Sequence, residues 1–275
     1  MVVGMQWKYT RLDGQTRHLG IARSSAVKSV VNLVKTAETL VPYSKDSVNL
    51  GLLLWNKIDE IPEEDRVKML DELTNADILR LWRLAGQRHE ASIADISSSK
   101  VPSYSIWNDL PGEDSSLVRY RGRAALPIRL LGQEYFEKAF FSMPGEDKET
   151  PHPNIYGRVF HGNVLKNRGY PGPLYFKAAV GGSLVPMLSD TCDMVLSYAL
   201  PEEEEGELAA LASEFGWVGP RKNPPPFDGD FTDYVRVVGP GVLVGLGYQE
   251  ETPAATGLSR LFPRPLFFAM IRIMP

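Results

Sequence analysis

The sequence predicts an α+β protein in which short N-terminal helices pack on a mainly antiparallel, barrel-like β-sheet with one inserted helix. Three observations support this fold class. Apolar residues recur at helical spacing through residues 24–86. Short aromatic and β-branched runs alternate with glycine- and proline-rich stretches in the rest of the chain, and residues 231–273 contain three such runs in succession. Strands that follow one another without regular helices between them argue against a parallel Rossmann sheet.

Three or four short amphipathic helices are predicted in the N-terminal part, because a helix-start signal precedes each apolar face. These signals are Ser24 or Ser25, Asp46 or Ser47, Pro62 with the acids after it, and Thr74. Thr74 and Asp77 have the spacing of a capping box, and the helix that they start should end near Gly86. A strand is also expected at residues 7–9.

Residues 91–116 are rich in the serine, proline, asparagine and glycine of loops. We interpret them as a connecting loop between an N-terminal strand and helical subdomain, residues 1–90, and a β-barrel-like domain, residues 117–275. Trp107 stands inside this loop, and a tryptophan in a loop is expected to be held in a groove.

The barrel-like domain is predicted from a series of strand signals bounded by turn residues. The expected strands occupy residues 117–123, 155–161, 174–180, 194–200, 231–238, 242–248 and 265–273. Residues 127–143 suit either a helix or a strand. Acidic residues at the start and Gly216 at the end predict the inserted helix at residues 202–215. Gly239 and Gly241 flank a proline in a tight turn, where glycine permits a positive φ.

Composition and charge narrow the classes of function. The formal net charge of −4 gives no general attraction to nucleic acid or to an anionic membrane. No apolar run approaches the ~20 residues needed to span a bilayer, so we expect no membrane-spanning helix. The single cysteine, Cys192, cannot form an internal disulfide and is interpreted as a packing residue. We expect an intracellular, cytoplasmic protein, with a plastid or another organelle as the alternative because residues 1–36 are basic.

No motif predicts a metal site or a cofactor. The histidines lack zinc-ligand spacing. The glycine pairs at 239–241 and 245–247 do not open a helix, so phosphate binding is not expected. His161, at the end of a predicted strand, is interpreted either as a surface residue or as a general base inside a barrel. As a base it would need an orienting acid, for which Asp190, Asp193 and Asp233 are candidates.

Asp233 and Arg236 project from opposite faces of one predicted strand. If the face with Val235 and Val237 is the core, Asp233 lies at a barrel rim or is buried with a partner. If the other face points inward, Arg236 enters the cavity, where it could bind a ligand carboxylate. Arg272, in the last strand, is then its companion or competitor.

Three features of the C-terminal part resemble the closing strands of small lipocalin-like barrels, including the plastid-lipid-associated (fibrillin-type) proteins. They are Asp233-Tyr-Val-Arg236, the turn at 239–241, and Phe267-Phe-Ala-Met-Ile-Arg272. Those proteins also begin with short helices. The resemblance implies binding of hydrophobic molecules such as lipids, pigments or terpenoids. Some lipocalin-like barrels are isomerases or cyclases instead, because an apolar pocket with a few polar groups can orient a reactive intermediate.

The sequence therefore predicts binding of a small hydrophobic ligand in a lipocalin-like barrel. The expected ligand-binding residues are Trp107, Tyr175, Arg236, Tyr248 and Arg272. The first alternative is an isomerase- or cyclase-type enzyme acting on a lipophilic substrate in the same pocket, with His161 and Asp233 as catalytic residues. The second alternative is an interaction subunit that docks a protein partner through the helices at residues 24–86.

Overall fold

The computed structural model describes most of the chain, and every structural statement below concerns these parts. They are residues 24–37, 48–99, 101, 104–112, 117–126, 135–143, 152–161, 173–186, 188–200, 202–221, 223, 231–249 and 265–274. The strand expected at residues 7–9 lies outside them. No helix in these ranges is both long and apolar enough to cross a bilayer.

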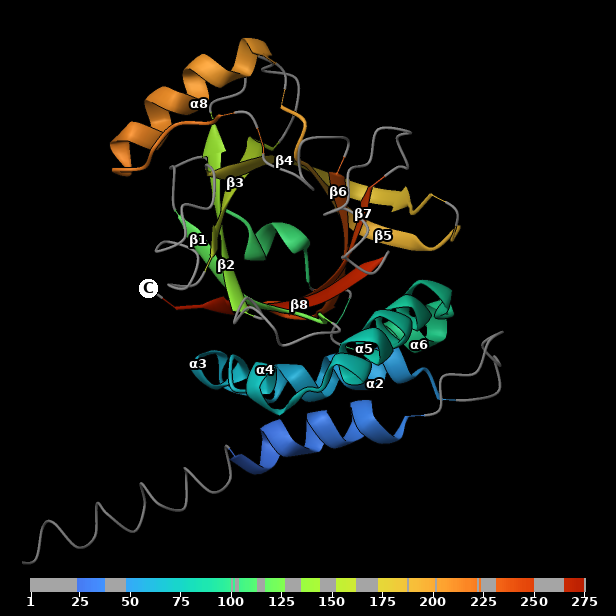
Figure 1. Ribbon diagram of the computed structural model, residues 1–275. Coiled ribbons are helices and arrows are strands. Elements are labelled where there is room, and N and C mark those ends of the chain that lie inside the picture. The colour runs from blue at the N-terminus through green and yellow to red at the C-terminus, as the bar shows by residue number, and fades with distance from the viewer. Residues whose placement is uncertain are drawn as a thin grey trace, which may run out of the picture.

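Eight antiparallel strands form a closed barrel in which each strand pairs with the next and β1 pairs with β8 (Figure 1). The strands are β1 Val118–Ala124, β2 Tyr135–Met143, β3 Asn154–His161, β4 Leu174–Leu184, β5 Thr191–Ser197, β6 Phe231–Gly239, β7 Val242–Gln249 and β8 Leu266–Ile273. The predicted antiparallel, barrel-like sheet is confirmed. The second half of the segment at residues 127–143, which suited either a helix or a strand, is strand β2.

The hairpin of β6 and β7 has the predicted glycine-dependent turn. Gly241 has a φ of +69°, a conformation that residues with a Cβ rarely adopt. Gly239 is needed for a different reason, since a Cβ at this position would lie 2.8 Å from Cγ2 of Ile58. The register shifts between Val237 and Gly239, so a bulge carries the strand into the turn beneath the helices.

Helices form in the N-terminal part, as predicted. After a first helix over residues 24–36 come α2 Leu50–Asp59, α3 Glu63–Arg66, α4 Met69–Glu72, α5 Asn75–Gln87 and the 3₁₀ helix η1 Arg88–Glu90. One more helix, α6 Ile93–Ser97, lies in the stretch that was expected to be a connecting loop, where Ser92 and Asp95 form a capping box that starts it. The capping box of Thr74 and Asp77 is confirmed at the start of α5. The prediction that Asp46 or Ser47 caps the second helix is wrong, because α2 begins at Leu50 and the side chain of Asn49 accepts its Leu52 N–H.

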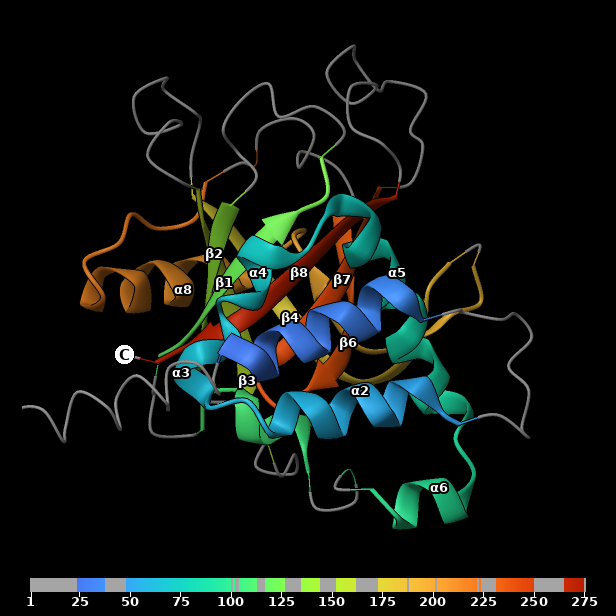
Figure 2. The same ribbon diagram turned by 90° about the horizontal axis from the view of Figure 1, so that it is seen from below.

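The helical group covers the outside of β6, β7 and β8 (Figures 1 and 2). Side chains alternate between the two faces of a strand, so every second residue of these strands points to the helices. The outward residues that join the helices in one core are Val238, Val242, Val244, Leu246, Ala269 and Ile271. Burial of this apolar seam fixes the helices against the barrel wall.

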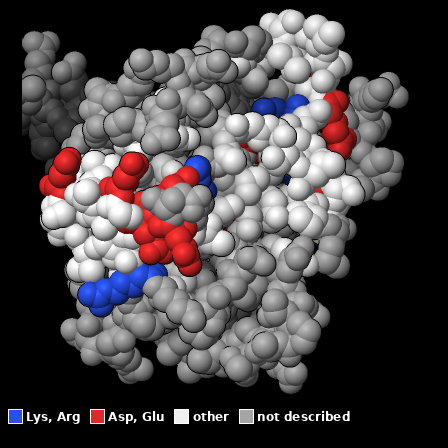
Figure 3. Space-filling model, turned by 90° about the horizontal axis from the view of Figure 1, so that it is seen from above, with Lys and Arg blue, Asp and Glu red and all other residues white. Residues whose placement is uncertain are grey.

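Helix α8, Glu202–Glu214, is the predicted inserted helix and lies between β5 and β6 in the chain. Its Leu208 and Ala212 pack with Phe141, Tyr156 and Tyr175 on the outside of β2, β3 and β4. Its other side presents acidic side chains to solvent, visible as a red group in Figure 3. The barrel is therefore covered on two different sides by helices from different parts of the chain (Figure 1).

A short segment closes one end of the barrel. The 3₁₀ helix η3, Ile106–Asp109, belongs to the stretch expected as a connecting loop, and it lies across the end of the barrel, within the outline of the ring of strands in Figure 1. Asp109 fastens it there. Its carboxylate accepts the Gly241 N–H at 2.6 Å and a hydrogen bond from the Tyr104 hydroxyl, and its backbone oxygen accepts the Tyr120 hydroxyl at 3.0 Å. We call this end, where β6 ends and β7 begins, the plugged end.

Candidate functional site

Strand β6 resolves which face of its Asp-x-x-Arg element points inward. Val235 and Val237 belong to the core inside the barrel, so Asp233 on the same face also points inward. Arg236 points outward to helix α5. Its guanidinium carbon lies 4.0 Å from the Trp82 ring, and it donates hydrogen bonds to the backbone oxygens of Trp82 and Thr191 at 2.8 and 2.6 Å.

Asp233 is buried with two partners, Lys138 from β2 and Tyr198 from the end of β5. The Lys138 ammonium donates to Oδ2 of Asp233 at 2.5 Å, and the Tyr198 hydroxyl donates to the same oxygen at 2.8 Å. Only 2% of Lys138 and 3% of Asp233 are exposed. Because β2 and β6 are not neighbours in the sheet, this ion pair crosses the interior of the barrel. We call these three residues the lumen cluster.

Four aromatic rings surround the ammonium of the lumen cluster. Nζ of Lys138 lies 4.5 Å from the ring centroid of Phe268 and 5.5–5.7 Å from those of Phe136, Phe176 and Tyr198. These distances are within the range of cation–π attraction, which is strongest where water is excluded. The rings and the carboxylate together stabilise a positive charge in an otherwise apolar lumen.

We call the four rings around the Lys138 ammonium the aromatic box. Glycines in the barrel wall make room for three of these rings. Three of the rings lie over a glycine that is their direct partner on the neighbouring strand, in the pairs Gly122 with Phe136, Gly157 with Phe176, and Gly245 with Phe268. A Cβ at the three glycines would lie only 2.3, 2.2 and 2.1 Å from the ring Cζ atoms. The missing side chains thus let the rings lie flat against the wall and face the lysine.

Burial changes the acid–base behaviour of the lumen cluster. Removal from water lowers the pKa of Lys138, an effect that the neighbouring Asp233 opposes. Burial, and then the charge of Asp233, raise the pKa of Tyr198, so its phenol keeps its proton. The cluster therefore combines an amine, a carboxylate that can accept its proton, and a hydroxyl donor.

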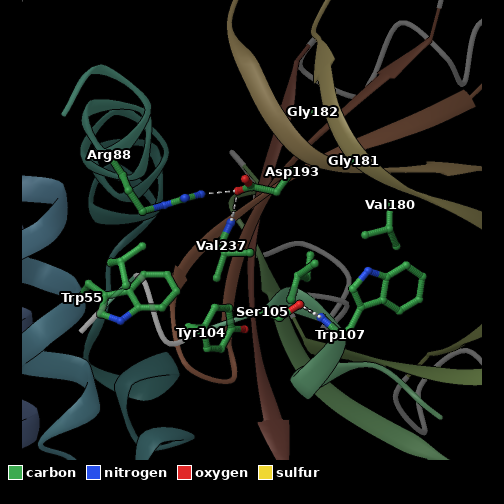
Figure 4. A pocket seen from close by; sticks show the side chains of 12 residues that line it. Trp55, Arg88, Tyr104, Ser105, Trp107, Val180, Gly181, Gly182, Asp193 and Val237 are labelled. Atoms are coloured by element: carbon green, nitrogen blue, oxygen red, sulfur yellow. Dashed lines mark hydrogen bonds and ion pairs between the residues drawn. The ribbon is translucent and has the colours of Figure 1, made fainter. Parts of the chain in front are cut away.

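A cleft of about 310 Å³ opens at the plugged end between η3, α2 and strands β4, β5 and β6 (Figure 4). Its apolar lining consists mainly of Trp55, Tyr104, Ile106, Trp107, Val180 and Val237. The rings of Trp55 and Tyr104 meet edge to face with their centroids 4.7 Å apart. Gly181 and Gly182 border the cleft, and open space lies where their side chains would be.

An ion pair forms the polar end of this cleft. Arg88 donates to Oδ2 of Asp193 at 2.6 Å, and the Val237 N–H donates to the same oxygen at 2.8 Å (Figure 4). His89 lies 3.6 Å from the other carboxylate oxygen, and burial lowers the pKa of its imidazole despite this neighbour. The cleft thus has aromatic walls and, at one end, an ion pair whose two charges neutralise each other.

The structure separates the residues that the sequence suggested as ligand-binding. Trp107 lines the cleft, with its ring stacked on His152 at 4.0 Å. Tyr175 lies on the outside of the barrel under α8 and donates its hydroxyl to the oxygen of Val218 at 2.7 Å. Arg272 lies at the plugged end, where it donates to Oδ1 of Asp109 at 3.3 Å.

The remaining suggested residues do not gather at one place. Arg236 packs under α5, and Tyr248 shares the outward face of β7 with Leu246. Asp190 accepts the indole N–H of Trp82 at 2.9 Å on the outside of the barrel. In this position it does not face the interior, where an acid that orients a catalytic base would be needed. His161 ends β3 opposite Phe136, and its imidazole lies outside the described part of the chain. Of these candidates, Asp233 alone belongs to the lumen cluster.

Sequence reasoning missed Lys138 and Tyr198. A signal was present for the lysine, since Lys138 stands between Phe136 and Phe140 with the spacing of one strand face. A lone charge on an otherwise aromatic face predicts a buried, paired group once the segment is known to be a strand.

The residues with described positions contain no group of three or more histidine, cysteine, aspartate or glutamate side chains placed to hold a metal ion. Comparisons with protein families, with curated proteins and with solved structures each find no match to this chain. The closed, eight-stranded antiparallel barrel with its flanking helices is consistent with a lipocalin-like architecture.

Proposed function

We propose that this protein binds a small, largely apolar molecule in the cleft at the plugged end of its barrel. The observation that carries the proposal is the aromatic lining of the cleft by Trp55, Tyr104 and Trp107. Ligand sites are typically concave, mostly apolar spaces of about 300–1,000 Å³ with a few placed polar groups. A volume of about 310 Å³ is at the lower end of this range and fits a small, flat molecule.

The chemistry of the lining defines the ligand further. Indole and phenol rings offer large rigid surfaces that lose little conformational freedom on binding. Arg88 and Asp193 neutralise each other, so they favour a ligand with a neutral hydrogen-bonding end over one with an isolated charge. The resemblance to plastid-lipid-associated proteins suggests a lipid, a pigment or a terpenoid-like compound.

Titration with the neutral planar fluorophore 1-aminoanthracene tests this site. We expect the Trp107→Ala variant to bind the probe at least about tenfold more weakly, which corresponds to about 1.4 kcal/mol. The matched control is Trp217→Ala, because Trp217 packs outside the barrel with Phe141 and Phe215. Circular dichroism checks that both variants are folded. Equal affinities for wild type and Trp107→Ala, or an equal loss in both variants, would contradict the proposal.

A further inference from the structure

We infer that Lys138 is a carbonyl-reactive amine that holds a neutral, apolar aldehyde as a reversible imine inside the barrel. This site differs from the cleft at the plugged end and extends the proposed function to a covalent one. The inference rests on the position of Nζ among four aromatic rings and beside a carboxylate at 2.5 Å. Lys177, on the outside of the barrel, also lies beside a ring and a carboxylate, with the Tyr156 centroid at 5.5 Å and Oε1 of Glu204 at 2.5 Å, but it has one ring in place of four and 37% of its side chain is exposed.

The charge balance of the lumen cluster selects the class of ligand. Lys138 and Asp233 carry one positive and one negative charge, so the pair is neutral as a unit. A carboxylate ligand would bring an uncompensated negative charge beside these buried side chains, and an ammonium ligand would bring an uncompensated positive one. A neutral carbonyl adds no charge. Its hydrocarbon part suits the rings of Phe136, Phe176 and Phe268.

The chemistry needs only groups of the cluster and the aldehyde. Asp233 takes a proton from the Lys138 ammonium, and the free amine then attacks the carbonyl carbon. The C–N bond forms as the C=O π bond breaks, and the oxygen takes a proton from the attacking nitrogen to give a carbinolamine. The protonated Asp233 then gives its proton to the carbinolamine hydroxyl, which leaves as water while the nitrogen lone pair forms the C=N bond. The product is an iminium ion beside the Asp233 carboxylate, while the Tyr198 hydroxyl continues to donate to that carboxylate.

The four aromatic rings stabilise the iminium ion for the same reason that they stabilise the Lys138 ammonium, namely its positive charge. The iminium ion carries one positive charge, as the ammonium did, and it occupies the same place among the rings. The reaction therefore exchanges one cation for another of larger apolar surface. A purely structural ion pair would need the charge of Lys138 but not its nucleophilicity, so a covalent readout distinguishes the two roles.

Phe136 is the one ring around the Lys138 ammonium that is partly exposed. It is the second residue of β2 and is partly exposed, whereas Lys138 two residues further on is buried. Its ring centroid is 5.7 Å from Nζ. Removing this ring should widen the approach without removing the amine, the carboxylate or the phenol.

Trapping with cinnamaldehyde and sodium cyanoborohydride tests the inference on the full-length protein. Reduction converts the imine to a stable secondary amine, which intact mass and peptide mapping locate. We expect the first adduct on Lys138, before the exposed Lys68 reacts, and at least a fivefold faster reaction in Phe136→Ala. Cinnamate, the carboxylate counterpart, should not compete. The Lys138→Arg variant should lose this adduct.

Two outcomes would overturn the inference. One is labelling of Lys68 and other exposed lysines while the Lys138 peptide stays unmodified. This outcome can be tested on the wild-type protein alone. The other is an unchanged first adduct in a folded Lys138→Arg variant. The Trp107→Ala variant, which changes the cleft and not the lumen, should keep the cinnamaldehyde adduct on Lys138. Failure of the cleft proposal would therefore appear in the binding of 1-aminoanthracene, and failure of this inference would appear in the mass of the Lys138 peptide.

Discussion

The Asp233→Asn variant is expected to lose about 3–5 kcal/mol of unfolding free energy, because it leaves the Lys138 charge buried without a carboxylate. Both partners are 3% exposed or less, and Tyr198 donates to the carboxylate oxygen that also receives the lysine. The asparagine keeps the volume and one acceptor oxygen. The measured loss therefore reports the missing charge and not a cavity. Urea unfolding followed by tryptophan fluorescence gives the value.

The double variant Lys138→Met/Asp233→Leu is the informative control. Replacing both partners of a buried ion pair by apolar residues is often neutral or stabilising, so this variant should lose much less stability than Asp233→Asn, although the Tyr198 hydroxyl also loses its acceptor on Asp233. A second control is Lys177→Met, which breaks a partly exposed ion pair with Glu204 and should cost no more than about 1 kcal/mol. A loss in Asp233→Asn as small as that in Lys177→Met would show that the lumen pair is not desolvated.

The loss in Asp233→Asn should also depend on pH. Burial already lowers the pKa of Lys138 in the wild-type protein, and removal of the Asp233 charge, which opposes this effect, lowers the pKa further. In the unfolded chain the pKa of Lys138 is near 10.4. Between the lowered pKa of Lys138 in the folded variant and this value, the unfolded chain binds more protons than the folded variant. Stability rises with pH where the unfolded state binds more protons. The difference from wild type should therefore narrow as pH rises from 7 toward about 10, while Tyr198 stays protonated because its pKa is raised.

The pattern of side chains along single segments was enough to predict much of this fold. The strands β6, β7 and β8 follow from short apolar runs and a glycine turn, and α5 follows from its capping box. These are local signals, since each depends on residues within about one element. They predict which segments are strands or helices but not which strands become neighbours across a closed sheet.

The candidate site depends on what local signals cannot supply. Lys138 and Asp233 are 95 residues apart in the chain and meet because closure of the barrel brings β2 opposite β6. Arg236 illustrates the same limit, since the alternation of β6 left two faces open and only the packing of α5 shows which is outside. Trp107 was correctly expected to be held in a groove, but its cleft forms between η3 and residues of α2, β4, β5 and β6, which are distant from η3 in the chain.

The Gly245→Ala variant tests how the barrel wall shapes the lumen cluster. A Cβ at this position would lie 2.1–2.6 Å from three atoms of the Phe268 ring, so the ring must move into a space already occupied by other side chains. Phe268 is 3% exposed and meets Phe136 edge to face at 5.7 Å. Such overpacking typically costs about 1–3 kcal/mol, and we expect a loss of that size in urea unfolding.

Two variants make this result specific to the ring over Gly245. Gly182→Ala should change stability by no more than about 0.5 kcal/mol, because nothing lies within 4 Å of the added Cβ and the backbone there has no positive φ. In a Phe268→Leu background the ring atoms are gone, so the Gly245→Ala substitution should cost less than in wild type, and the cycle of four proteins should show a coupling between the two positions. Equal costs in both backgrounds would mean that Phe268 does not lie over Gly245. The ring nearest to the Lys138 ammonium, at 4.5 Å, would then lack the support that the glycine gives it.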